Sequence, residues 1–119
     1  MPQLIDAPTR IPVPGGKVID EYVGRVTSST SAVSVAHMQA PAGWAEPAQT
    51  PEFDEVTVVL AGTVLLEHDG GTLQVAAGQA VVTRAGERIR YSVGEFGAEY
   101  IAVCVPAFAP DLVNREDEG

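Results

Sequence analysis

The chain has few residues of the kinds that support disulfides, metal sites or nucleic-acid binding. Its 119 residues include one cysteine, two histidines and seven lysines and arginines, against sixteen aspartates and glutamates. A single cysteine excludes an internal disulfide. The net charge of -9 repels phosphate backbones and anionic membrane surfaces, so neither nucleic acid nor membrane is expected as a partner.

Long apolar runs are also missing. No run approaches the roughly 18 residues of a membrane-spanning helix, and the start MPQLIDAPTR lacks the basic and apolar blocks of a signal peptide. These absences predict a cytoplasmic protein. With 45% apolar residues the chain is long enough for one core but not two, so we expect a single domain that folds alone or as a symmetric oligomer.

Short valine-rich segments, separated by glycine, dominate the middle of the chain and predict antiparallel strands. The Asp-Gly and Gly-Gly steps of HDGGT predict a tight hairpin between TVLLEH and TLQVA. Strands without covering helices must close on themselves, so a small barrel or jelly roll is expected. The predicted strands are VIDEYVGRV, AVSVAHM, EVTVVLA, TVLLEH, TLQVA, QAVVTR, RIRYSV and AEYIAVCV.

Three regions follow from this pattern. Residues 1–18 hold four prolines and a Gly-Gly pair, so they predict an extended N-terminal arm along a sheet edge. Residues 19–110 contain the barrel strands. Residues 111–119 predict a short C-terminal helix, started by Asp111, and an acidic tail. Phe108, between prolines, is expected to close one end of the barrel, and Cys104 is expected to be a buried small hydrophobe.

Two blocks of the sequence resemble the motifs of the cupin superfamily, over roughly residues 30–108. The first block has the spacing Gly43, Gln49, Pro51, Glu55 and Gly62, and the family places histidines where Gln49 and Pro51 stand. The second has the spacing Gly78, Arg84, Gly86 and Ile89, and the family places a histidine where Ile89 stands. The resemblance implies an all-β, single-domain cupin jelly-roll barrel. The sequence is also similar to the small single-domain bacterial cupins of the ethanolamine-utilisation type, which lack the histidine set.

The usual cupin metal site requires three imidazoles and a carboxylate, and only Glu55 of that set is kept. Pro51 and Ile89 offer no side-chain ligand, so no metal cofactor is expected. An atypical site for a hard divalent cation such as Mn or Mg stays open, with Gln49, Glu52, Glu55 and His37 as oxygen and nitrogen donors.

His37 lies mid-strand in AVSVAHM, and the sequence does not decide which strand face turns inward there. A slip of one residue would exchange His37 for Met38 in the barrel interior. His68, beside the hairpin turn, is expected at the surface.

Four carboxylates gather before the strand EVTVVLA, at Glu46, Glu52, Asp54 and Glu55. Two interpretations compete. Either most are solvated loop charges and only Glu55 faces inward, or Glu52 and Glu55 share the barrel mouth with Gln49 as a cation site or an acid/base pocket.

Alternation along RIRYSV places Tyr91 on the same strand face as Ile89, with Arg88 and Arg90 on the other. If Ile89 faces the interior, as the resemblance implies, Tyr91 lines the same cavity. Thr57 shares the face of Glu55 and adds a hydroxyl. A mostly apolar chamber of this kind raises the pKa of a glutamate and favours a small uncharged or cationic ligand.

These residues predict a cupin barrel that binds a small molecule and forms a homodimer. The favoured activity is metal-independent isomerisation or elimination, with Glu55 as general acid/base and Tyr91 as its hydrogen-bonding partner. The candidate ligand-binding residues are Gln49, Glu52, Thr57, Ile89, Trp44 and His37. Trp44 is expected either over the ligand at the barrel mouth or against the arm or a second subunit. The alternatives are a metalloprotein and a non-catalytic sensing module with a narrow or filled barrel.

Overall fold

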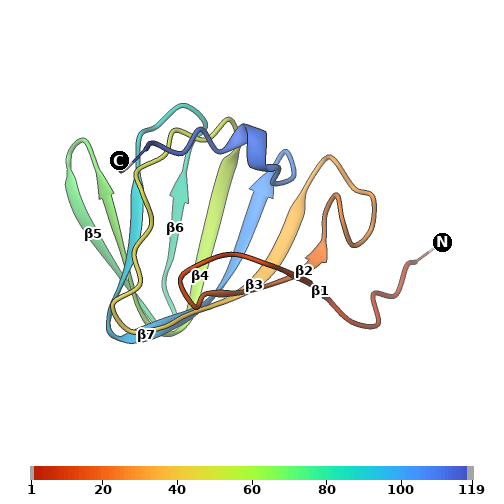
Figure 1. The fold of residues 1–119 in the computed structure, drawn as a ribbon, viewed down its shortest axis with the longest axis horizontal. Helices are drawn as coiled ribbons and strands as arrows, with labels where there is room; N and C mark the ends of the chain where they lie inside the picture. Colours follow the sequence, from red (N-terminus) through yellow and green to blue (C-terminus); the bar gives the residue numbers. More distant parts are fainter. Residues whose placement is uncertain (1, 118–119) are drawn as a thin grey trace.

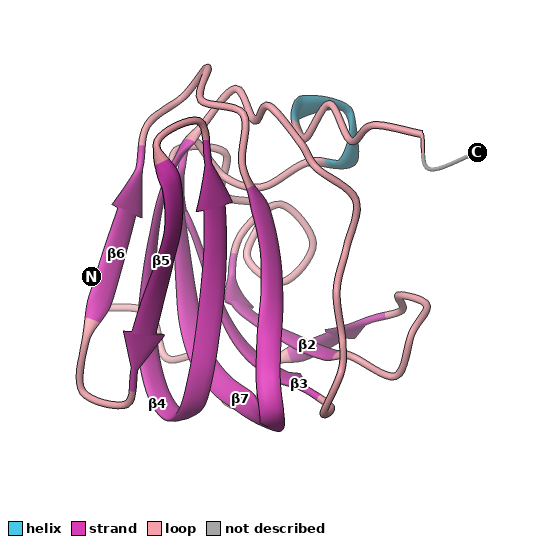
Figure 2. Cartoon of the chain, turned by 90° about the vertical axis from the view of Figure 1, so that its left-hand side faces the viewer, coloured by secondary structure: helices cyan, strands magenta, loops and turns pink. Residues whose placement is uncertain are grey.

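The structure, a computed structural model, describes residues 2–117 and consists almost entirely of β-strands. Its strands form one antiparallel sheet in the order β1-β2-β3-β7-β4-β5, and β6 also pairs with β4. Figures 1 and 2 show this sheet curling around an interior. The elements are β1 (Thr9–Ile11), β2 (Val18–Val23), β3 (Ser34–Ala40), β4 (Asp54–His68), β5 (Gly71–Ala76), β6 (Ala80–Thr83), β7 (Arg90–Val105) and the 3-10 turn η1 (Pro110–Leu112). The predicted all-β barrel is thereby confirmed.

The two longest strands each combine two segments that the sequence predicts as separate strands. β4 runs through 15 residues and β7 through 16, with register shifts where they pass each other near Gly62. Gly62 has φ +74°, and a Cβ there would lie 2.1 Å from the carbonyl oxygen of Gly97. Only glycine permits both that dihedral angle and that approach. Gly62 therefore bends a continuous strand at the corner of the barrel, where the sequence predicts the end of a strand.

The hairpin between β4 and β5 has the predicted form. His68 pairs with Gly71, so Asp69 and Gly70 make a two-residue turn. This turn fixes the register in which β5 covers the second half of β4, while β6 covers the first half.

The segment before β4 closes the barrel against β7. Gln49 and Ile89 exchange two backbone hydrogen bonds, of 2.8 and 2.9 Å, and the Val93 amide donates to the Trp44 carbonyl at 3.1 Å. The two blocks that carry the cupin resemblance thus lie side by side.

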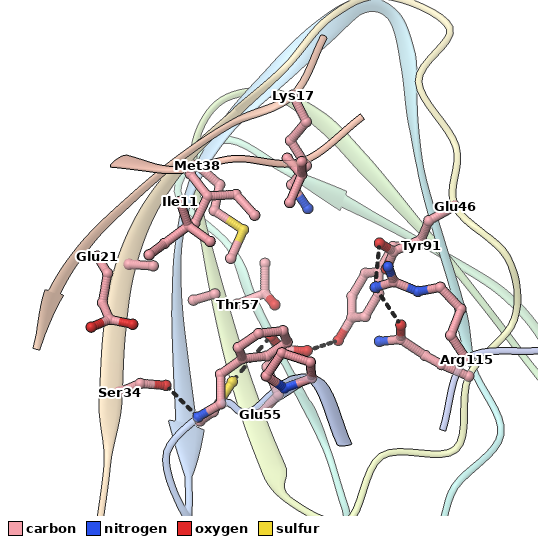
Figure 3. Close-up of a pocket in the computed structure, with 18 of the residues that line it drawn as sticks. Ile11, Lys17, Glu21, Ser34, Met38, Glu46, Glu55, Thr57, Tyr91 and Arg115 are labelled. Carbon is pink, nitrogen blue, oxygen red and sulfur yellow. Dashed lines mark hydrogen bonds and ion pairs between the residues drawn. The ribbon is translucent and has the colours of Figure 1, made fainter. Parts of the chain in front are cut away.

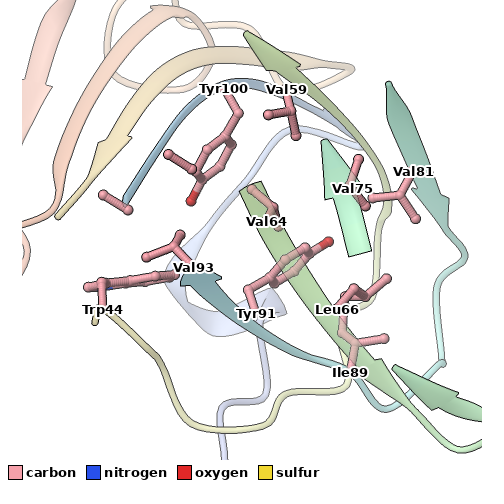
Figure 4. Close-up of a cluster of buried hydrophobic side chains, with 12 residues drawn as sticks. Trp44, Val59, Val64, Leu66, Val75, Val81, Ile89, Tyr91, Val93 and Tyr100 are labelled. Atoms are coloured by element: carbon pink, nitrogen blue, oxygen red, sulfur yellow. The ribbon is translucent and has the colours of Figure 1, made fainter. Parts of the chain in front are cut away.

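Alternation along the strands divides the interior into an apolar part and a polar part. The main hydrophobic cluster is built on Val59, Val64, Leu66, Ile89 and Tyr91, together with neighbours from β5, β6 and β7 (Figure 4). Phe53, Cys104 and Val113 form a second cluster at the C-terminal end, against which Phe108 packs. The inward residues of β4 between these clusters are Glu55 and Thr57, so polar groups occupy the middle of the barrel.

Both ends of the chain contribute to the closed barrel. β1 pairs with β2 at the edge of the sheet, and the connecting turn passes over the interior. The predicted C-terminal helix is reduced to the single turn η1, because Asn114 adopts φ +53° and ends the helical path. Residues 118–119 of that predicted element lie outside the described residues. Within residues 2–117 no helix is long and apolar enough to cross a membrane.

Candidate functional site

A cavity of about 370 Å³ occupies the polar middle of the barrel (Figure 3). Its walls come from the N-terminal arm, the inward faces of β2, β3, β4 and β7, the segment before β4 and the C-terminal segment. A cavity of this volume with few polar groups among apolar walls is typical of small-molecule binding sites.

Glu55 and Tyr91 form the polar centre of this cavity. The Tyr91 hydroxyl donates a hydrogen bond of 2.7 Å to Oε1 of Glu55, and the Cys104 thiol contacts Oε2 at 3.5 Å. The pair arises because inward positions of β4 and β7 face each other across the barrel, and both residues are buried. One carboxyl group and one phenol thus share a site that opens on the cavity.

Burial controls the protonation of these groups. It raises the pKa of Glu55 above the ordinary value, and the hydrogen bonds from Tyr91 and Cys104 oppose that rise. Burial and then the charge of Glu55 raise the pKa of Tyr91 well above its usual value, so Tyr91 stays a donor. Burial also raises the pKa of the Cys104 thiol, which keeps it protonated and unsuited to act as a nucleophile.

A second polar group lies on one wall of the cavity. Nη2 of Arg115 donates to Oε2 of Glu46 and to Oε1 of Gln49, both at 3.2 Å. Burial raises the pKa of Glu46, opposed by the positive charges of Lys17 and Arg115. The Glu46 carboxylate, which the sequence left among the solvated loop charges, therefore faces inward with a partner.

Lys17 enters the cavity from the arm. Its Nζ lies 4.1 Å from the centroid of the Trp44 ring and 5.4 Å from that of Tyr100, in cation-π geometry. Burial lowers the pKa of Lys17, and the charges of Glu46 and Glu55 oppose that change. Trp44 thus both lines the cavity and packs beneath the arm, two of the positions expected for it.

The residues at the positions of the cupin metal ligands do not fit a metal centre. Pro51 and Ile89 have no donor atom in their side chains, the Gln49 amide oxygen accepts from Arg115, and the Glu55 carboxyl accepts from Tyr91. No group of three or more His, Cys, Asp or Glu side chains within residues 2–117 could hold a metal ion.

The structure brings together some of the predicted site residues. Glu55, Tyr91, Thr57, Gln49 and Trp44 all line the cavity.

The remaining predicted site residues lie elsewhere. His37 is on the outer face of β3, where Nε2 lies 2.6 Å from Oε2 of Glu99, while Met38 lines the cavity. Glu52 is exposed and accepts a hydrogen bond from Asn114, because the loop before β4 turns it outward. Ile89 packs inside the main hydrophobic cluster instead of lining the cavity. The predictions of His37, Glu52 and Ile89 as ligand-binding residues therefore need correction.

Sequence reasoning missed Lys17 and Arg115. Lys17 belongs to the predicted extended arm and Arg115 to the predicted acidic tail, and no periodicity marks either one. Only the paths of the two chain ends over the barrel bring these cations to the cavity.

Comparisons with solved structures define the class of this fold. EutQ from Salmonella typhimurium matches with a TM-score of 0.61 at 22% identity, covering 77% of this chain and 71% of that chain. KdgF from Halomonas matches with a TM-score of 0.71 at 16% identity, covering 88% and 91%. A variant of Streptomyces PAC13, solved with uridine, matches with a TM-score of 0.74 at 15% identity, covering 96% and 88%. These are cupin-fold proteins, and the chain has the cupin jelly-roll fold.

Sequence comparison gives one curated relative to set beside the structures. It is endoribonuclease YbeY of Myxococcus xanthus, 45% identical over 107 residues that cover 89% of this chain. The match takes up 36% of that protein, so this chain spans about a third of the length of the relative. No protein-family model matches the chain.

Proposed function

We propose that the chain binds a small molecule in the barrel cavity and moves a proton on it without a metal, as an isomerase or a lyase. The observation that carries this proposal is the buried Glu55 carboxyl, hydrogen-bonded by Tyr91 at 2.7 Å and facing a cavity of about 370 Å³. A carboxyl with a raised pKa exchanges protons near neutral pH more effectively than an ordinary one.

The proton transfer follows from the chemistry of the two side chains. The ionised Glu55 removes a proton from a carbon next to a carbonyl group, and the C–H electron pair moves toward the carbonyl oxygen. The protonated Glu55 then returns the proton to another carbon in an isomerisation, or a neighbouring substituent leaves in an elimination. Tyr91 holds the carboxylate in one orientation through its hydroxyl, and Thr57 offers a second hydroxyl in the same cavity.

Deuterium incorporation into a panel of candidate substrates tests this proposal. The protein is incubated in D2O with small aldehydes, ketones and 2-oxo acids, and loss of the proton next to the carbonyl is followed by proton NMR. We expect exchange on at least one compound and a loss of about 10²–10⁴-fold in Glu55→Gln. Glu95→Gln, at an exposed glutamate of β7 outside the cavity, is the matched control and should keep the wild-type rate. Exchange no faster than in buffer, or undiminished in Glu55→Gln, contradicts the proposal.

A non-catalytic ligand-sensing module is the second candidate. This candidate is supported by the match to a longer protein named as an endoribonuclease. The segment similar to this chain makes up 36% of that protein, so it is joined there to other sequence. The net charge of -9 disfavours direct contact with RNA. A cavity of about 370 Å³ differs from the narrow or filled barrel that the sequence predicts for a sensing module. Ligand-induced thermal stabilisation without deuterium incorporation would favour sensing over catalysis.

A homodimer is proposed as well, from an apolar strip on the outer face of the sheet that includes Val58, Leu60 and Val82. These side chains are between 36% and 49% exposed, whereas single copies of a protein rarely leave broad apolar surfaces open. Sedimentation equilibrium would give the mass of a dimer, and Leu60→Glu should shift it toward the mass of one chain.

A further inference from the structure

The Lys17 ammonium contacts the faces of two aromatic rings at the cavity. Nζ lies over Trp44 and Tyr100, and Figure 3 shows it on the side of the cavity away from Glu55. Aromatic faces attract a cation but accept none of its hydrogen bonds in the way that an oxygen atom does. Within residues 2–117, neither a hydrogen bond nor an ion pair joins this ammonium to another residue. Its N–H donors are therefore available to a ligand.

The other two cations at the cavity are already engaged. Arg115 donates to Glu46 and Gln49, and Arg25 donates to the carbonyl oxygen of Ala107 at 3.3 Å. Lys17 is thus the cavity cation that a bound group can pair with at no loss of an existing bond.

The charged side chains that line the cavity balance, three cations against three carboxylates, when Glu55 is ionised. Lys17, Arg25 and Arg115 face the carboxylates of Glu21 and Glu46, and Glu21 already accepts hydrogen bonds from the amides of residues 26 and 27. Burial raises the pKa of both Glu46 and Glu55, and protonation of either one leaves an excess of positive charge. The excess is one unit when Glu55 is protonated, in a chain whose net charge is -9.

We propose that Lys17 binds the anionic group of the ligand, and that the ligand is a small organic monocarboxylate. Its carboxylate pairs with the Lys17 ammonium, and its uncharged carbon skeleton extends toward Glu55 and Tyr91. One carboxylate carries a single negative charge and so matches the single Lys17 ammonium, whereas a phosphate ester carries close to two at pH 7. This inference rests on the proposed function, because the cavity must bind a ligand. An anionic ligand differs from the uncharged or cationic ligand that the sequence predicts.

The composition of the chain provides two reporters for a test. Lys17 is the only lysine and Trp44 the only tryptophan, and the two side chains are in contact. Tryptophan fluorescence therefore reports binding beside Lys17. The probes are pairs of equal shape that differ in charge: pyruvate and pyruvamide, lactate and lactamide, and 3-methylbutanoate with its amide.

We expect at least one carboxylate to bind about tenfold or more tightly than its amide, a preference that weakens as salt is added. Lys17→Met should abolish the preference and Lys17→Arg should keep most of it. Arg84→Met, which removes an exposed cation outside the cavity, is the matched control and should leave the preference unchanged.

A second measurement covers the case in which Lys17→Met does not fold. Reductive ¹³C-methylation of the wild-type protein preserves the charge and labels Lys17, and its resonance should shift with the carboxylates but not with the amides. Equal affinity for both members of every pair, or an unchanged preference in Lys17→Met, overturns the inference and leaves the proposed function standing. Failure of every carboxylate probe to bind also overturns the inference, whereas the proposed function is contradicted only by the absence of deuterium exchange or by exchange undiminished in Glu55→Gln. Loss of deuterium exchange in Glu55→Gln with the carboxylate preference intact supports both.

Discussion

Replacing Tyr91 by phenylalanine tests the polar pair of the cavity with little disturbance to packing. The change removes only the hydroxyl group that donates a 2.7 Å hydrogen bond to Oε1 of Glu55. The ring belongs to the main hydrophobic cluster, with the residue 5% exposed, so its apolar contacts remain. The effect of Tyr91→Phe therefore reports the hydrogen bond more than the packing.

The size of the effect depends on the charge of Glu55. A hydrogen bond to a neutral partner contributes about 0.5–1.5 kcal/mol to the free energy of unfolding, and one to a charged partner about 1.5–3 kcal/mol. Tyr91→Phe should therefore cost the smaller amount where Glu55 is protonated and the larger amount where it is ionised.

The direction in which stability changes with pH follows from the raised pKa of Glu55. Burial raises the pKa of Glu55 in the folded protein above that of the unfolded chain. The stability linked to this group is therefore fully present below the unfolded pKa and is lost as the pH rises through the folded pKa. Since the Tyr91 hydrogen bond opposes the rise, removing it raises the pKa of Glu55 further and enlarges the loss. Tyr91→Phe should become more destabilising as the pH increases.

Urea unfolding of four proteins measures this coupling: wild type, Tyr91→Phe, Glu55→Gln and the double variant, each from about pH 4 to about pH 8. The cost of Tyr91→Phe should rise with pH in the wild-type background and stay flat in the Glu55→Gln background. The reasoning is refuted if Tyr91→Phe costs the same at both ends of the range and the same in both backgrounds.

Three further predictions concern packing, the barrel corner and the buried thiol. Leu66 is 2% exposed, so Leu66→Ala should lower the free energy of unfolding by about 2–5 kcal/mol in denaturant titrations. Leu73 is 47% exposed, so Leu73→Ala should change the same quantity by no more than about 0.5 kcal/mol. Similar costs for the two variants would contradict the assigned core. A Cβ at Gly78 meets no atom within 4 Å, so Gly78→Ala should lower the stability by about 1–2 kcal/mol for its left-handed φ alone. A Cβ at Gly62 also meets a β7 carbonyl oxygen at 2.1 Å, so Gly62→Ala should lower the stability further in thermal melts. A Gly62→Ala protein as stable as Gly78→Ala would contradict the close approach at the barrel corner. Iodoacetamide should modify Cys104 only after unfolding, because the thiol is buried and burial raises its pKa. Rapid labelling of the folded protein, measured by mass spectrometry, would be inconsistent with that burial.

The strands and the hairpin could be predicted because they depend on local pattern. Alternating apolar residues and the Asp69-Gly70 turn define β4 and β5 from neighbouring positions alone. The continuity of β4 through Gly62 could not be predicted, because it depends on the close approach of Gly97 from a distant part of the chain. Asn114 ends the expected C-terminal helix after one turn, which propensity alone does not indicate.

The candidate site, like the fold, could be predicted from the sequence only in part. Glu55 and Tyr91 follow from strand alternation together with the cupin spacing, since both lie inside regular strands. His37 and Met38 differ by one position, and only the observed register of β3 decides that Met38 faces the cavity. Lys17 was missed because the path of the arm across the barrel is a property of the whole fold.

The titration of the Glu55 carboxyl tests the central claim most directly. Protein labelled with ¹³C at glutamate carboxyls is followed by NMR as a function of pH, and the Glu55 resonance is assigned by its absence from Glu55→Gln. We predict that it titrates above the ordinary glutamate value of 4.5, and higher still in Tyr91→Phe. A midpoint at or below that of the exposed glutamates, unmoved by Tyr91→Phe, would contradict the account of Glu55 as a buried acid/base group.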